Sequence, residues 1–378
     1  MARVLITVHL GRHFRIFGHY DYKVLLDMGH EVHIAANFKN EIDQFEDPRV
    51  IKHQIDFDRN PFSFSNILAY KQLRDLLKRY KYDLIHTQSP SGGAITRLAA
   101  RNERKNGTKL IYTAHGFHFF KGAPLKNWLL YYPIEKWLSK FTDCLLTIND
   151  EDFNCAMKKG FKFNYVFKIN GVGIDLNKFK PQKEEKKKEL RTDYGFRDED
   201  FILIYVAELS NRKNQEMIIN VINKLKKEIK NIKLLLVGTG KYKNKYQNKV
   251  KKKCLEENVL FLGYRKDVPN LMLLSDIAVS TSKQEGLPLN VMEAMATGLP
   301  LVVTDCRGNR DLVKNDENGY VVKVNDIDEF TNKVIKLYSS ADLREKFSNS
   351  SLIKIQDFSV EKVTNEMKRI YNLFLKNK

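Results

Sequence analysis

The chain has 378 residues, of which 43% are hydrophobic and 29% charged, and its formal net charge is +19. This composition is typical of a globular protein and excludes a disordered or collagen-like chain. The length predicts about two domains, and the apolar runs are too short to predict a membrane-spanning helix. The four cysteines lack metal-ligand spacing, and the chain starts like a first strand rather than a signal peptide, so we expect a reduced, cytoplasmic setting.

Positive charge is concentrated in the first half of the chain. Residues 59–140 hold 15 basic and 4 acidic side chains, a net charge of +11. A field of this sign raises the local concentration of anions, such as phosphates, anionic lipid headgroups or nucleic acid. For any single lysine, the alternative is an ordinary solvated surface.

Short β-branched runs alternate with segments of helical period along the chain. Such alternation predicts parallel strands that helices cover on both faces. We expect strands at 3–8, 31–36, 82–87, 109–113, 144–148, 166–169, 201–206, 233–237, 259–262, 277–280, 301–304 and 320–322. We expect helices at 15–28, 64–80, 91–105, 151–159, 215–229, 245–256, 289–297 and 327–338.

A polar, lysine-rich break at 181–191 separates two such runs. The predicted fold class is therefore α/β, with two Rossmann-like doubly wound parallel-sheet domains facing across a cleft. We place the first domain at 1–182, the second at 183–358 and a C-terminal helix at 359–378. Ligands of such folds bind at the carboxyl ends of the strands.

The segment 284–311 is the most informative one. A loop with Glu285 leads to Pro288, which suits the first turn of a helix, and this helix ends at Gly298. A helix N-terminus offers free N–H groups and a partial positive charge, which suit a diphosphate. Glu285 and Glu293 flank this helix start and can accept hydrogen bonds from sugar hydroxyls. As an isolated pair, they would instead be a helix cap and a solvated side chain.

This segment resembles the signature of retaining glycosyltransferases of family 4, and the resemblance extends over nearly the whole chain. It rests on Glu285 and Glu293 followed by AMATGLPLVVTD, and on the segments GHEVHIAA, YDLIHTQSP, TAHGFH, INGVGID and LLLVGTG. The resemblance implies the GT-B fold, a nucleotide-sugar donor, an active site between the domains, and a last helix that crosses back to the first domain. The segment TAHGFHFFKGAPLKNW is most similar to members that build bacterial capsule or exopolysaccharide.

The family pattern implies roles for the residues of the second half. Glu293 would bind the ribose hydroxyls, and Glu285 would bind the donor sugar. Sugar or phosphate would also touch Gly286 and the amides near Leu287 and Leu289.

Lys213 matches the lysine that neutralises the diphosphate. The family usually has an arginine where this chain has Glu208, which puts a clamp of two cations in doubt. Arg212 could take over part of that role from another direction. The alternative for Arg212 and Lys213 is a solvated loop before a helix, but the spacing match favours phosphate binding.

Three candidates lie in the first half. His115 follows a buried strand and would contact the transferring sugar and the phosphate. His118 is a weaker candidate, because it could instead pack among the neighbouring phenylalanines. Gly11 follows the first strand and would let the backbone approach the diphosphate.

Two further features have competing interpretations. Asp-x-Asp triples can hold a metal in other transferases, but the four here are interpreted as turns and caps, so neither a metal nor a cofactor is expected. The segment 125–140 holds Trp128 and Trp137 among lysines, which suits a lipid headgroup layer. Because its apolar residues lie all round a helix, we favour a buried helix whose basic edge can face a membrane.

We therefore expect a retaining, metal-independent glycosyltransferase that moves a hexose or N-acetylhexosamine from a UDP-sugar to an undecaprenyl-diphosphate-linked saccharide. It would work in cell-surface polysaccharide biosynthesis, in peripheral contact with the anionic inner face of the cell membrane and without a nucleic-acid partner. The alternatives are a UDP-sugar 2-epimerase, which needs no acceptor, a basic nucleic-acid-binding protein, and a catalytically inactive scaffold. Glu285→Gln or Lys213→Ala is expected to abolish transfer with thermal unfolding nearly unchanged.

Overall fold

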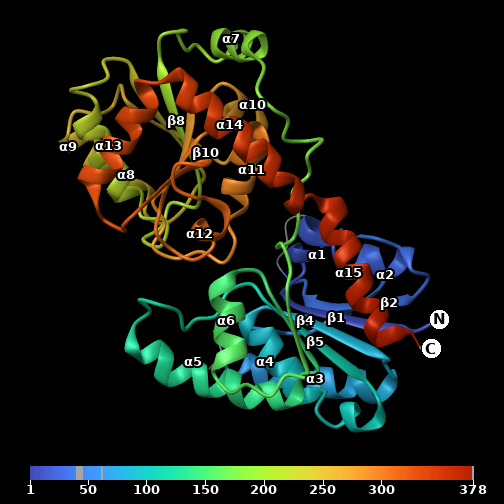
Figure 1. The fold of residues 1–378 in the computed structure, drawn as a ribbon. Coiled ribbons are helices and arrows are strands. Elements are labelled where there is room, and N and C mark those ends of the chain that lie inside the picture. The colour runs from blue at the N-terminus through green and yellow to red at the C-terminus, as the bar shows by residue number, and fades with distance from the viewer. Residues whose placement is uncertain (40–45, 61–62, 377–378) are drawn as a thin grey trace. The chain divides into compact units, whose positions relative to one another are not determined.

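The computed structural model describes residues 1–39, 46–60 and 63–376. They form two compact units: unit 1 comprises Met1–Gly173 and Val360–Lys378, and unit 2 comprises Ile174–Ser359 (Figure 1). Each unit is built on one parallel β-sheet with helices on both faces, which confirms the prediction of an α/β protein with two doubly wound parallel sheets.

The sheet of unit 1 has seven strands in the order β3-β2-β1-β4-β5-β6-β7. The strands are β1 (Arg3–Leu10), β2 (Glu31–Asn37), β3 (Ile51–Gln54), β4 (Leu84–Gln88), β5 (Lys109–Ala114), β6 (Cys144–Thr147) and β7 (Tyr165–Lys168). The helices are α1 (Arg12–Phe17), α2 (Tyr22–Asp27), α3 (Ser65–Arg79), α4 (Pro90–Ala99), α5 (Leu125–Leu138), α6 (Asp150–Lys158) and α15 (Val360–Leu375).

The sheet of unit 2 has six strands in the order β10-β9-β8-β11-β12-β13. The strands are β8 (Phe201–Val206), β9 (Ile232–Val237), β10 (Val259–Gly263), β11 (Ile277–Ser280), β12 (Leu301–Thr304) and β13 (Gly319–Val322). The helices are α7 (Glu184–Asp193), α8 (Gln215–Leu225), α9 (Lys243–Lys252), α10 (Val268–Leu273), α11 (Leu289–Thr297), α12 (Asn309–Leu312), α13 (Ile327–Tyr338) and α14 (Ala341–Ile355).

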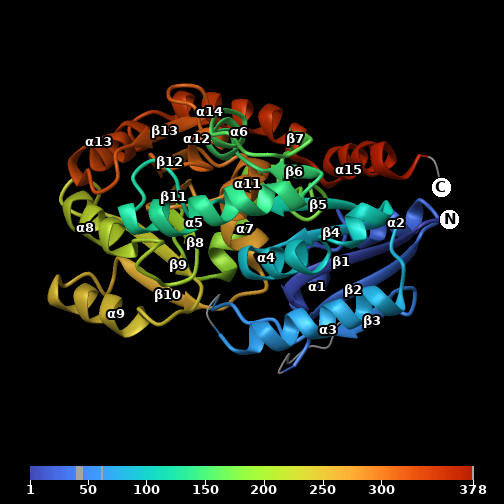
Figure 2. The same cartoon turned by 90° about the horizontal axis from the view of Figure 1, so that it is seen from below.

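Successive side chains of a strand point to opposite faces of the sheet, so each sheet has two apolar faces that helices cover. In unit 1, the apolar side chains of α3 and α4 share one core with those of β1 and β4. Both helices lie against the sheet of unit 1 (Figure 2). The opposite face of β4 meets α15, where the Tyr371 hydroxyl lies 2.7 Å from His86 Nδ1. In unit 2, α8, α9 and α13 cover one face of the sheet, while α7, α10 and α11 cover the other.

Several elements differ from the prediction. The helix expected at 15–28 is two short helices, α1 and α2, and the one expected at 91–105 ends as α4 at Ala99. The edge strand β3 was missed because its residues, IKHQ, are mostly exposed and lack an apolar run. Helix α14 was missed because its apolar residues do not follow one face of the helix.

The division between the units falls earlier than residue 182. Phe179 is 3% exposed and packs in the core of unit 2. The Gln182 side chain donates hydrogen bonds to the carbonyls of Leu273 and Ser275, both at 2.7 Å. Residues 174–182 therefore belong to unit 2, while the last helix, α15, belongs to unit 1 and contacts α2.

Helix α5 is not buried, so the burial expected for 125–140 is wrong. Only Glu135 and Leu138 in this helix are buried, and Glu135 accepts two hydrogen bonds from the buried Arg97, at 2.7 and 2.9 Å. Trp128 packs against Phe119, with the ring centroids 5.5 Å apart. The contacts of Glu135 and Trp128 hold one side of α5 against unit 1. On the other side, a row of apolar side chains stays exposed, namely Leu125, Leu129, Leu130, Ile134 and Trp137.

Within the described residues, no helix combines the length and the apolar character that crossing a membrane requires.

Candidate functional site

The candidate site of unit 2 lies where three strands end. The loop after β8 carries Lys213, the loop after β11 carries Glu285, and the loop after β12 leads to Gly308. Because parallel strands end at the same edge of a sheet, these loops meet although they are far apart in the sequence.

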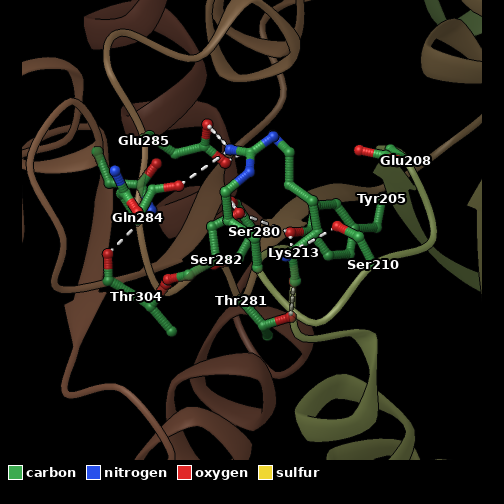
Figure 3. A network of polar contacts seen from close by, with 12 residues as sticks. Tyr205, Glu208, Ser210, Lys213, Ser280, Thr281, Ser282, Gln284, Glu285 and Thr304 are labelled. Carbon is green, nitrogen blue, oxygen red and sulfur yellow. Dashed lines mark hydrogen bonds and ion pairs between the residues drawn. The ribbon is translucent and has the colours of Figure 1, made fainter. Parts of the chain in front are cut away.

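The centre of the site is the buried pair of Lys213 and Glu285 (Figure 3), beside which lies a second, exposed cation, Arg212. Lys213 Nζ donates to Glu285 Oε1 at 2.5 Å, and Arg212 Nη1 donates to Glu285 Oε2 at 3.1 Å. The side chains of Lys213 and Glu285 are 11% and 6% exposed, whereas that of Arg212 is 46% exposed. The cluster thus has a fixed buried pair and one cation that reaches solvent.

The surrounding charges control the ionisation of Glu285. Burial alone would raise the pKa of this carboxyl, but the charges of Lys213 and Arg212, together with hydrogen bonds, outweigh burial and lower its pKa. Glu285 is therefore ionised at neutral pH, and it is not the helix cap of the alternative interpretation, because α11 has no side-chain cap.

Hydrogen bonds to the backbone hold Lys213 in position. Its carbonyl accepts the Tyr205 hydroxyl at 2.7 Å and the Thr281 hydroxyl at 3.3 Å. The Tyr205 hydroxyl also lies 2.9 Å from Ser282 Oγ (Figure 3). The loops after β8 and β11 are therefore tied together beneath the charged cluster.

Helix α11 begins beside this cluster. Pro288 precedes its first turn, and among the described residues no acceptor bonds the N–H groups of Leu289 and Asn290. Two free N–H groups and the positive end of the helix dipole suit an anion.

Glycine lets the neighbouring loop approach the start of α11. Gly308 has a φ of +79°, and a Cβ there would lie 2.5 Å from the carbonyl oxygen of Gly286. Any other residue at 308 would push this loop away from the helix start.

Glu293 lies on α11, apart from the ion pair. It is partly buried, and its carboxyl has no hydrogen-bond partner within the described part of the chain. Burial raises its pKa to about 7, and the positive charge of Lys178 opposes this shift. A carboxyl without partners can accept hydrogen bonds from a diol, which would stabilise its ionised form.

The first-half candidates lie in unit 1, each in a different environment. His115 follows β5 and lies 2.8 Å from Gln88, through Nε2 and Oε1. His118 instead packs its ring on Tyr131, with centroids 4.6 Å apart. Gly11 has a φ of −63°, and its N–H donates to the Asn37 carbonyl at 3.1 Å. The amide of Gly11 is therefore occupied, and the close approach of its backbone to the diphosphate stays a prediction.

Sequence reasoning missed two participants in the unit 2 site. Arg307 is 3% exposed, and its Nε donates to the Glu285 carbonyl at 2.8 Å. Against the larger effect of burial, the positive charge of Lys178 lowers the pKa of Glu293. Lys178 lies in a segment that the sequence placed in the first domain but that belongs to unit 2. A basic residue in the loop after the buried strand β12 is the signal that could have identified Arg307.

The Asp-x-Asp triples have structural partners. Asp326 caps α13 through the Glu329 N–H, as predicted for a cap, and Asp56 pairs with Lys39 at 2.7 Å. Among the residues placed by the structure, no group of three or more His, Cys, Asp or Glu side chains has the arrangement of a metal site.

Comparison with known proteins identifies the family. Residues 186–352 match the model of glycosyl transferases group 1, and residues 9–149 match that of glycosyl transferase 4-like proteins. Over 373 residues, the chain is 39% identical to the putative glycosyltransferase EpsD of Bacillus subtilis, covering 99% of this chain and 97% of EpsD. The chain is a group 1 glycosyltransferase.

Another relative of this glycosyltransferase has a named substrate. The UDP-Gal:α-D-GlcNAc-diphosphoundecaprenol α-1,3-galactosyltransferase of Escherichia coli is 29% identical over 328 residues, covering 85% of this chain and 83% of the relative. Among solved structures, Anabaena HepE in complex with UDP and glucose aligns with a TM-score of 0.78 at 18% identity, covering 99% and 100% of the two chains. Sucrose-phosphate synthase of Thermosynechococcus elongatus aligns over 100% of both chains with a TM-score of 0.82 at 16% identity. The fold of this glycosyltransferase is therefore GT-B, as the resemblance implied.

Proposed function

We propose that this glycosyltransferase moves a hexose or N-acetylhexosamine from a UDP-sugar to an undecaprenyl-diphosphate-linked saccharide, with retention of configuration, in cell-surface polysaccharide assembly. The observation that carries the proposal is the Lys213–Arg212–Glu285 cluster beside the free amides of α11. The named substrates of the E. coli galactosyltransferase support the choice of donor and acceptor.

The diphosphate of the donor would lie against Lys213 and the start of α11. Lysine has three N–H donors, and Glu285 accepts only one of them here, so two remain for phosphate oxygens. Arg212 can add a second positive charge from the solvent-exposed side of the site. It would take the role of the arginine that the family usually has at the position of Glu208. Glu293 would accept hydrogen bonds from the ribose hydroxyls.

Transfer then needs no protein nucleophile. The bond between the sugar C1 and the phosphate oxygen breaks, and its electron pair leaves with the diphosphate. The acceptor hydroxyl oxygen bonds to C1 on the same face, and its proton passes to the departing phosphate oxygen. Lys213 and the α11 amides stabilise the negative charge that develops on the leaving group.

A ligand screen by thermal unfolding tests the donor. At a hundred times its dissociation constant, a ligand stabilises its protein by about 2.7 kcal/mol, which raises the unfolding temperature of a unit of this size by roughly 5–10 °C. We expect this shift with UDP and UDP-sugars but not with GDP. A shift with GDP alone would contradict the uridine nucleotide, and interconversion of free UDP-sugars without an acceptor would favour the epimerase.

The exposed row of α5 supports contact with a membrane that carries the acceptor. Leu129 is 71% and Trp137 46% exposed, and the exposed Lys126, Lys136 and Lys140 lie in the same segment. Apolar side chains flanked by lysines match the interface of an anionic bilayer.

Leu129→Glu is expected to weaken binding to anionic phospholipid vesicles at least about tenfold, because burying one leucine is worth roughly 1.5–3 kcal/mol. Co-sedimentation with anionic and with zwitterionic vesicles measures this. Met157→Glu is the matched control, because Met157 is a 60% exposed apolar residue on α6. Equal vesicle binding by the two variants would contradict a role for α5.

A further inference from the structure

Beyond the ion pair of unit 2, unit 1 contains a buried polar network at the carboxyl end of β4. Gln88 lies at its centre and is 1% exposed. Its Nε2 donates to Asp21 Oδ2 at 3.0 Å, and its Oε1 accepts from the Tyr20 hydroxyl and lies 2.8 Å from His115 Nε2. Asp21 and Tyr20 are 0% exposed, so few other partners can reach this network.

The chemistry of the partners determines how the Gln88 amide is oriented. A carboxylate only accepts hydrogen bonds, and Asp21 Oδ1 already accepts the Tyr22 N–H. Asp21 Oδ2 must therefore face the Gln88 NH2 group, which turns the amide oxygen toward Tyr20 and His115. An amide oxygen also only accepts, so His115 must donate from Nε2.

His115 therefore has one defined tautomer. Burial, together with the nearby His13 and His86, lowers its pKa to about 3, so the ring is neutral at neutral pH. A neutral imidazole carries a single N–H. With that hydrogen on Nε2, Nδ1 is left as a hydrogen-bond acceptor.

The ionisable groups around His115 are few. The His13 ring lies 6.1 Å from the His115 ring, and His13 Nε2 is 3.4 Å from Asp21 Oδ2 without forming a hydrogen bond. His86 is bonded to Tyr371 and Thr113, both at 2.7 Å. Among these described neighbours, only the Gln88 oxygen contacts His115 Nε2.

We infer that Asp21 and Gln88 are positioning residues that set the tautomer of His115, so that its Nδ1 accepts a hydrogen bond from a sugar hydroxyl. This inference rests on the proposed function for the presence of the sugar. The family resemblance implied that His115 contacts both the sugar and the phosphate, and the tautomer limits this contact to the sugar. Phosphate oxygens only accept hydrogen bonds, so a neutral ring with a bare Nδ1 selects a hydroxyl and not the diphosphate.

Asp21→Asn tests the inference, because it should reverse the donor and acceptor directions of the hydrogen bonds from residue 21 through Gln88 to His115. The new amide would keep its oxygen toward the Tyr22 N–H, and its NH2 group would then face Gln88. Gln88 would turn its oxygen toward Asn and its NH2 toward His115, so the ring hydrogen would move to Nδ1. Two-bond ¹H–¹⁵N correlation spectra of ¹⁵N-histidine-labelled protein report this, with His115→Gln used to assign the signal.

We expect Nε2–H in the wild type and Nδ1–H in the Asp21→Asn variant. We expect kcat/KM to fall about tenfold or more, while the Kd of UDP, which lacks the sugar, stays unchanged. Asp143→Asn is the control for lost stability, because Asp143 is another buried carboxylate of unit 1, paired with Arg104 at 2.6 Å. It should keep Nε2–H on His115.

Gln88→Met provides a second variant if Asp21→Asn does not fold. Methionine has a similar length but no amide, so His115 should populate both tautomers. An Nδ1–H ring in the wild type, or an altered tautomer with unchanged kcat/KM, would overturn the inference. Failure of the wild type to bind UDP would overturn the proposed function instead, and the tautomer would still be readable.

Discussion

Replacing Lys213 by alanine is expected to lower kcat/KM by about a thousandfold, because it removes a positive charge that stabilises the departing diphosphate. Lys283→Ala is the matched control. Lys283 lies in the loop after β11 and bonds to Asn211 at 3.0 Å instead of to Glu285, so its loss should leave the rate unchanged. Initial rates of sugar transfer measure both variants.

The buried pair changes what the sequence suggested about stability. Lys213→Ala removes the buried cation that pairs with Glu285, which is 6% exposed, and leaves the solvent-facing Arg212 beside it. Breaking a buried pair costs roughly 3 kcal/mol, so thermal unfolding should not stay nearly unchanged. The double variant Lys213→Ala/Glu285→Gln removes the stranded charge and should recover most of the stability but none of the activity. Recovery of both would contradict a catalytic role for Lys213.

Replacing Glu293 by glutamine is expected to stabilise the protein at pH 8 while weakening nucleotide-sugar binding. The pKa of Glu293 is raised to about 7 in the folded protein. Its contribution to stability is therefore fully present below about pH 4.5 and is lost as the pH rises through 7. Allowing for its partial exposure, the ionised form costs on the order of 2 kcal/mol, and glutamine avoids this cost.

Unfolding temperatures at pH 5 and pH 8 measure the stability effect. We expect Glu293→Gln to raise the unfolding temperature by roughly 5 °C at pH 8, with little change at pH 5. Glu185→Gln, which alters an exposed glutamate of α7, is the control and should change neither value.

Binding provides the second measurement. The wild type should bind a UDP-sugar more tightly as the pH rises from 6 to 8, because the ionised carboxylate is the better acceptor for the ribose hydroxyls. Glu293→Gln should lose this dependence and about ten- to hundredfold in affinity at pH 8. Affinity that stays at the wild-type value would contradict ribose binding by Glu293.

Local patterns predicted the strands of unit 2 well. The bounds of β8, β11 and β12 agree with the prediction, because each is a buried β-branched run bounded by polar or turn-forming residues. The start of α11 was equally clear, since Pro288 and Gly298 mark its two ends in the sequence. Such signals are contained within a few neighbouring residues.

Side-chain environments could not be predicted in the same way. Helix α5 has apolar residues on all sides, and the contacts of Glu135 with Arg97 and of Trp128 with Phe119 decide which side is held against unit 1. The exposed row that results is a property of packing. For the same reason, no local pattern predicted that Gln88 would meet Asp21 and His115.

The sequence by itself determined the family and the two parallel sheets, and it gave Lys213, Glu285 and Glu293 as candidate site residues, because periodicity, helix punctuation and motif spacing are local. Only the tertiary structure decided how these groups are charged and paired. Lys213 and Glu285 are 72 residues apart in the chain, and their contact depends on two strands that end at one edge of the sheet. Burial raises the pKa of Glu293, whereas at Glu285 the charges of Lys213 and Arg212 outweigh burial and lower the pKa.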